Sequence, residues 1–133
     1  HCAYRGVVIM ASELRVNTLK DAAGNNSIAT SFVAGGSAKA WADVNASATY
    51  SIRNSLNISS VSDLGTGLLA DNFASTMSAA NYSAFCLSQL NGDFGQRFAT
   101  DPTASAWTYE IKDSTPSNVD RAWVHSGILG DLA

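Results

Sequence analysis

The sequence has little charge, little proline and no long apolar run. Charged residues make up 14% of its 133 residues, against about 25% in an average soluble domain. The eight Lys and Arg residues are scattered and the formal net charge is −3, so the chain lacks the basic patch that binding to nucleic acid requires. No apolar stretch approaches the roughly 20 residues of a membrane-spanning helix, and membrane insertion is not expected.

Cysteine is equally scarce, with Cys2 and Cys86 far apart in the chain. Two such residues do not form a disulfide framework, and they lack the close spacing of metal ligands. We expect both to be inert or buried thiols. The sequence also has no calcium-binding loop and no phosphate loop, so neither a metal nor a cofactor is expected.

Few residues could carry catalysis. Apart from His1, the only histidine is His125, which lies in an alternating segment that favours a structural role. Most aspartates lie in turn contexts, where capping of their own backbone explains them: Asp21, Asp63, Asp93, Asp101 and Asp113. The sequence therefore predicts a protein that is not an enzyme.

Small residues, turn signals and short alternating segments dominate what is present. Alternation is clear in residues 39–44, 56–59, 82–90 and 107–111, and turn signals separate these segments. In residues 121–129 both faces are partly apolar, which predicts a strand buried on both sides. Helical patterning is weak, and only residues 70–80 could form a turn or two, with Thr76 as a cap. The fold predicted is all-β, a small antiparallel β-sandwich or barrel-like domain with an extended N-terminal arm.

The first part of the chain differs from the rest. Residues 13–19 alternate, but few large side chains are available to bury them, and an isolated hairpin is only marginally stable. We expect residues 1–36 to form an arm that anchors on a neighbouring chain through Leu14, Val16 and Leu19, and residues 37–133 to form the β-sandwich. Met10-Ala11-Ser12 resembles an initiator context, which leaves residues 1–9 as a processing remnant, an upstream extension or part of a longer chain.

Large apolar residues in the alternating segments are the candidates for the core or for a subunit interface, because aromatic side chains gain most from burial. This set consists of Trp41, Leu56, Ile58, Phe73, Tyr82, Phe85, Trp107 and Trp123. The three tryptophans could instead stack on a sugar, and an exposed cluster of two or more of them would favour that alternative.

Residues 10–90 carry a pattern that resembles a known family. Lys39-Ala40-Trp41 is followed by the stretch IRNSLNISSVSD at residues 52–63, and then by Gly65-Thr66-Gly67, Asn72-Phe73 and Ala80-Asn81-Tyr82. This order resembles a β-rich domain of fibre and virion structural proteins of tailed bacteriophages, with its KAW, IRDSFNVSSITDNGTGDYTVNF and AMPDANY stretches. The sequence departs from that pattern at Asn54, at residues 68–71 and at residues 78–79.

The resemblance implies a virion component without catalytic residues. It implies a homo-oligomer, often a trimer, that stands as a fibre, knob or decoration subunit on the tail or the capsid, in contact with copies of itself and with other virion proteins. A receptor- or glycan-binding module at a fibre tip is the alternative. A small hydrolase acting on envelope polysaccharide rests only on the bacteriophage context.

Overall fold

The computed structural model describes residues 14–90, 92–97 and 101–133, without the side chains of residues 96 and 97. The chain divides into two compact units, His1–Val33 and Ala34–Ala133. The boundary lies within helix α1 (Thr30–Gly36), which is also where the predicted arm ends.

The described part of the first unit contains a short hairpin. Strand β1 (Thr18–Lys20) pairs antiparallel with β2 (Ser27–Ala29), and the Asp21 carboxylate organises the turn between them. Its oxygens accept hydrogen bonds from the backbone N–H of Asn25 at 2.9 Å and from Nδ2 of Asn26 at 2.7 Å. None of the residues in β1, β2 or α1 is buried. The three predicted anchoring residues, Leu14, Val16 and Leu19, are exposed.

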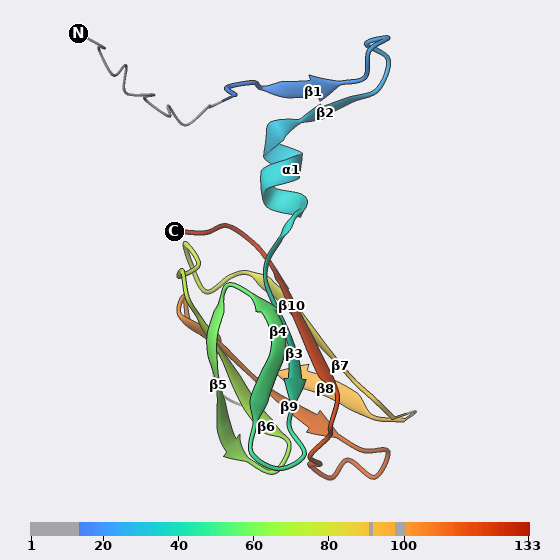
Figure 1. Cartoon of the computed structure of the whole chain (residues 1–133), viewed down its shortest axis with the longest axis vertical. Coiled ribbons are helices and arrows are strands. Elements are labelled where there is room, and N and C mark those ends of the chain that lie inside the picture. The colour runs from blue at the N-terminus through green and yellow to red at the C-terminus, as the bar shows by residue number, and fades with distance from the viewer. Residues whose placement is uncertain (1–13, 91, 98–100) are drawn as a thin grey trace, which may run out of the picture. The chain divides into compact units, whose positions relative to one another are not determined.

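The second unit is a β-sandwich, which confirms the predicted fold class. Its first sheet has the strand order β4-β3-β10-β7 and its second sheet the order β5-β6-β9-β8, with every pairing antiparallel (Figure 1). The strands are β3 (Ala38–Asn45), β4 (Ser51–Leu56), β5 (Ile58–Gly65), β6 (Leu68–Phe73), β7 (Ser83–Ser88), β8 (Phe94–Arg97), β9 (Ala106–Lys112) and β10 (Val124–Leu129).

Alternate residues of the strands fill the space between the two sheets, as the period of two in a strand requires. Ala40, Ala42 and Val44 of β3 alternate with partly exposed neighbours, and Trp107, Tyr109 and Ile111 of β9 are all buried. The core is completed by Ala46, Ile58, Leu69, Phe73, Met77, Val124 and Ile128. The rings of Trp107 and Tyr109 stack at 4.4 Å between centroids.

The chain passes from the first sheet to the second at Asn57. This residue has a φ of 56°, in the left-handed region that asparagine tolerates better than most residues. Its side chain accepts from the backbone N–H of Ser75 at 2.6 Å and donates to the Ser75 carbonyl at 3.0 Å. The prediction that residues 56–59 form one strand with a common apolar face is therefore wrong. Leu56 ends β4 on the outside of one sheet, whereas Ile58 begins β5 inside the other.

The short helix predicted within residues 70–80 is also wrong. Residues up to Phe73 belong to β6, which lies between β5 and β9, and no helix follows it in residues 74–80. Leu69, Asp71 and Phe73 are buried together on one side of β6, so pairing on both edges overrides the weak helical pattern.

The hairpin between β5 and β6 depends on Gly67. This residue has a φ of 64°, and a Cβ atom there would lie 2.6 Å from the Ile111 carbonyl oxygen and 2.7 Å from the Val119 nitrogen. Its N–H donates to the Asp120 carboxylate at 2.7 Å, and the Tyr50 hydroxyl donates to the same carboxylate at 2.8 Å. The turn is thus packed directly against the backbone that follows β9.

We expect Gly67→Ala to lower the free energy of unfolding by about 3 kcal/mol, because the methyl group meets fixed backbone atoms and the φ disfavours any side chain. Urea denaturation followed by circular dichroism measures this loss. Gly35→Ala is the matched control, since its Cβ would meet no atom within 4 Å. Equal stability of Gly67→Ala and the parent protein would contradict this account of the turn.

Candidate functional site

The outer surface of the first sheet carries a row of large apolar side chains. In the β-sheet register, Trp41 lies opposite Leu56 on one side and opposite Gly127 on the other, and Gly127 lies opposite Phe85. Directly opposed residues point to the same face of a sheet. Leu56, Trp41 and Phe85 therefore form a row that crosses all four strands.

These residues, together with Leu87 and Trp123, form what we call the apolar face. The exposed fractions are 47% for Leu56, 55% for Phe85, 64% for Leu87 and 47% for Trp123, and Trp41 is partly exposed. The prediction that residues 121–129 are buried on both sides is therefore wrong. One side of β10 faces the core, whereas Trp123 and His125 are exposed on the other.

The Phe85 ring can lie directly over β10 because residue 127 is a glycine. A Cβ atom on Gly127 would come within 2.3 Å of the Phe85 ring, so this ring occupies the space that a side chain on the central strand would take. Glycine is required at position 127 because the Phe85 ring approaches the backbone closely there, and not because the backbone adopts a positive φ.

One end of the apolar face is bordered by charged and polar groups. The guanidinium carbon of Arg53 lies 3.8 Å from the centre of the Trp123 ring, and its Nη1 lies 3.2 Å from the Asp43 carboxylate. The His125 ring stacks near Trp123 at 6.4 Å, and its Nδ1 lies 3.8 Å from the same Asp43 oxygen. Arg53 thus covers one face of the indole that a sugar ring would otherwise use.

The outer surface of the second sheet is different in character. Ser60, Ser62 and Asn72 lie there, and the Asn72 amide donates to the two serine hydroxyls at 3.0 Å and 2.9 Å. Small polar residues of this kind suit contact with water. The two outer surfaces of the sandwich therefore differ, and the first is the candidate interaction surface.

The carboxylate of Asp71 lies in the core and has no exposed surface. Its two oxygens accept hydrogen bonds from the Tyr109 hydroxyl at 3.2 Å and from the Ser126 hydroxyl at 2.5 Å, so the group joins β6 and β9 of one sheet to β10 of the other. Both of these partners are neutral. Burial raises the pKa of Asp71 to about 6, and the hydrogen bonds from Ser126 and Tyr109 offset only part of that rise.

The turn aspartates mostly behave as predicted. Asp63 accepts from the Gly65 N–H at 2.9 Å and Asp113 from the Thr115 N–H at 2.8 Å, as Asp21 does in the first unit. Asp93 differs, because its carboxylate binds the Arg121 guanidinium at 2.7 Å and 3.0 Å. The hydrogen bond from Arg121 is the main cause that lowers the pKa of Asp93.

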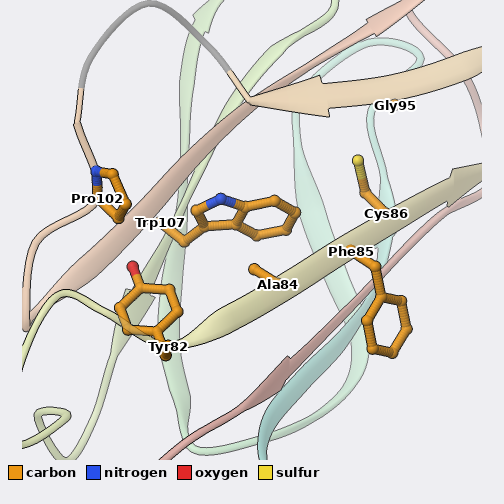
Figure 2. Close-up of a pocket in the computed structure, with 7 residues that line it drawn as sticks. All are labelled: Tyr82, Ala84, Phe85, Cys86, Gly95, Pro102 and Trp107. Carbon is orange, nitrogen blue, oxygen red and sulfur yellow. The ribbon is translucent and has the colours of Figure 1, made fainter.

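A small pocket of about 210 Å³ lies beside β7. Figure 2 shows Trp107 at its centre, with Tyr82 and Pro102 to one side and the Cys86 sulfur directed toward the strand that carries Gly95. Burial, with a further contribution from Asp71, raises the pKa of Cys86 to about 12, so the thiol stays protonated at neutral pH. The volume is below the range of about 300–1,000 Å³ for pockets that hold small-molecule ligands.

The predicted core or interface residues separate into two groups. Ile58, Phe73 and Trp107 lie in the core, and Tyr82 is partly buried against it. The Tyr82 hydroxyl donates to the carbonyls of Thr103 and Ala106 at 3.1 Å and 2.9 Å, and its ring meets Phe73 edge-on. The other four, Trp41, Leu56, Phe85 and Trp123, lie on the apolar face.

Sequence reasoning did not identify Asp71, Ser126 or Leu87 as important. Asp71 stands where the bacteriophage pattern has valine, and that departure was the one available signal for a buried acid. Within residues 14–90, 92–97 and 101–133, no three His, Cys, Asp or Glu side chains are grouped as metal ligands, and no helix is long and apolar enough to cross a membrane. Cys2 lies outside the described residues.

The comparisons with known proteins return nothing for this chain. No family model, no curated protein and no solved structure matches it.

We expect Asp71→Asn to be more stable than the parent protein at pH 7 by up to about 3 kcal/mol. The folded protein holds the Asp71 proton up to a pKa of about 6, whereas the unfolded chain releases it near 3.8. The contribution of this group to stability is therefore fully present below pH 3.8 and is lost as the pH rises through 6. The difference in unfolding free energy between the variant and the parent should grow over that window, as measured by urea denaturation at a series of pH values.

Asp131→Asn, at an exposed position near the C-terminus, is the control for an aspartate-to-asparagine change outside the core. A difference between Asp71→Asn and the parent that stayed constant from pH 4 to pH 7 would contradict a buried, titrating carboxylate.

Proposed function

We propose that this protein is a non-enzymatic structural subunit of a bacteriophage particle, in which it assembles with copies of itself as a fibre, knob or decoration protein of the tail or capsid. The observation that carries the proposal is the apolar face. Leu56, Phe85, Leu87 and Trp123 remain about half exposed although the core between the sheets is complete without them. A contiguous apolar surface of this kind marks an interaction site.

The residues that carry the bacteriophage resemblance support the same proposal. Asn57 fixes the corner between the sheets, Gly67 fits the tight turn after β5, and Tyr82 anchors the chain before β9. Each of these residues serves the fold. A pattern made of such residues favours architecture over reaction chemistry.

The chemistry of the apolar face favours packing between copies. Its aromatic and leucine side chains are typical of the buried centre of a protein interface, and Arg53 and Asp43 lie at its border, where polar residues are usual. The bacteriophage resemblance favours three copies.

We expect the full chain to be oligomeric at micromolar concentration in multi-angle light scattering and in native mass spectrometry. Phe85→Ser with Leu87→Ser should raise the dissociation constant about 100-fold, since two exposed anchors are lost at about 1.4 kcal/mol each. Leu64→Ser is the matched control, because Leu64 is 49% exposed on β5 in the other sheet. A monomeric parent protein, or purified particles that lack this chain by mass spectrometry, would overturn the proposal.

Glycan binding at a fibre tip is the second candidate function, and the half-exposed Trp123 favours it. Acrylamide quenching of the assembled protein separates the two functions. Packing between copies predicts that Trp123→Phe changes the quenchable fluorescence little, because the assembly already shields this ring. A sugar site predicts a strongly quenched Trp123 that surface polysaccharide from the host protects.

A further inference from the structure

The described part of the first unit has no interior of its own. None of residues 14–33 is buried, although this stretch contains both strands of the hairpin and the first residues of α1. A two-stranded hairpin is only marginally stable in water unless a further sheet or a helix covers one of its faces. A helix of seven residues is also marginal by itself. The first unit therefore depends on a contact with something outside it.

One face of the hairpin presents a pair of large apolar side chains. Leu19 of β1 lies directly opposite Ile28 of β2, so the two side chains point to the same face. Both are exposed, and so is Phe32 in α1, a helix without a charged residue. We call the surface formed by Leu19 and Ile28 the hairpin face.

The same chain carries a second uncovered surface, which is the apolar face of the first sheet. The core between the two sheets is complete without it, and Phe85 and Leu87 are its most exposed residues. The hairpin face and the apolar face are both faces of β-sheets. Apolar sheet faces pack on one another about 10 Å apart, as the two sheets of a sandwich do. A hairpin laid on a four-stranded sheet repeats that packing.

The charges of the two units are complementary. His1–Val33 contains three Lys and Arg residues against two Asp and Glu residues, whereas Ala34–Ala133 contains five against nine. The formal net charges are therefore +1 and −4. Two second units that approach each other repel, whereas a first unit and a second unit attract. Such complementarity favours the encounter of the unlike surfaces.

We propose that the hairpin face of one copy of this chain packs on the apolar face of a second copy, against Phe85 and Leu87. This inference rests on the proposed function, because it specifies which surfaces meet in the assembly. The contact covers both uncovered surfaces at once. Packing of two apolar faces on each other would leave Leu19 and Ile28 in water, and would bring the two units of like charge together.

The contact joins two different surfaces, so it is heterologous. Each copy supplies one hairpin face and receives another on its apolar face. A heterologous contact between identical chains closes into a ring when the rotation between neighbours permits it. In a closed ring every hairpin face and every apolar face is covered. A ring of three copies, the number that the bacteriophage resemblance favours, is compatible with this contact.

Cysteine cross-linking in the full chain tests the contact. In a Cys2→Ser, Cys86→Ala background, an isotopically labelled preparation carries Ile28→Cys and an unlabelled one carries Leu87→Cys. The two preparations are unfolded in urea, refolded together and treated with a short bis-maleimide. Mass spectrometry should detect a labelled–unlabelled dimer that is joined through residues 28 and 87. Leu64→Cys in place of Leu87→Cys is the matched control and should give no such dimer, because Leu64 is exposed on the second sheet.

Other packings would give other products. Contact between two apolar faces would cross-link the Leu87→Cys preparation to itself, and contact between two hairpin faces would cross-link the Ile28→Cys preparation to itself. A chain with both cysteines that is linked only internally would carry the hairpin on its own sandwich. Any of these products in place of the mixed dimer, or no cross-link in a protein that is still oligomeric, would overturn the proposed contact and leave the proposed function standing. A chain that is monomeric at every concentration would overturn both.

A double-mutant cycle supplies the second measurement. Leu19→Ser with Ile28→Ser should raise the dissociation constant about 100-fold, as Phe85→Ser with Leu87→Ser does, because each pair of changes removes the same contact. All four changes together should raise it far less than the roughly 10,000-fold expected of independent sites, because the second pair has no contact left to lose. Leu64→Ser should leave the constant unchanged. Additive effects of the two pairs would contradict direct packing of the hairpin face on the apolar face.

Discussion

The packing of two four-stranded sheets through their inner faces is the constraint on which the rest of this molecule depends. Once alternate residues of β3, β6, β9 and β10 fill that interior, the intervening residues must point outward. The two outer surfaces that result differ in the side chains they carry. One outer surface receives serine and asparagine, and the other receives Trp41, Phe85 and Leu87, so the same alternation that builds the core also creates the candidate interaction surface.

The carboxylate of Asp71 is a polar group buried within the apolar core. Its carboxylate bridges the sheets through Tyr109 and Ser126, and every buried side-chain polar atom of the described residues has a hydrogen-bond partner. A fully satisfied polar group fixes how one sheet sits on the other, although burying its charge has a cost at neutral pH. The core therefore combines a specific alignment with a stability that depends on the protonation of one residue.

The sequence predicts the fold class because turn chemistry and alternation are local properties. Trp107 to Ile111 reads as a strand and is one, and Asp63 and Asp113 cap their own turns. The prediction of a helix in residues 70–80 is wrong because strand pairing on both sides of β6 is non-local. The prediction for residues 56–59 is wrong because Asn57 adopts a left-handed φ inside an otherwise unbroken alternating pattern. The apolar face is predicted only as a set of large side chains, since alternation alone does not tell an interior face from an uncovered one.

Gly127 determines how closely the Phe85 ring of the apolar face lies to the sheet, although Gly127 has no side chain in that face. The Phe85 ring rests on the bare backbone of this central position, so its height above the sheet is set by a residue that a docked neighbour would never touch. A methyl group at that spot would lift the ring outward while leaving the strand ladder intact, since a flexible side chain yields before backbone does. Exchange of this glycine for alanine would therefore reshape the apolar face from beneath, by one added carbon atom and without a change in any side chain that forms the face.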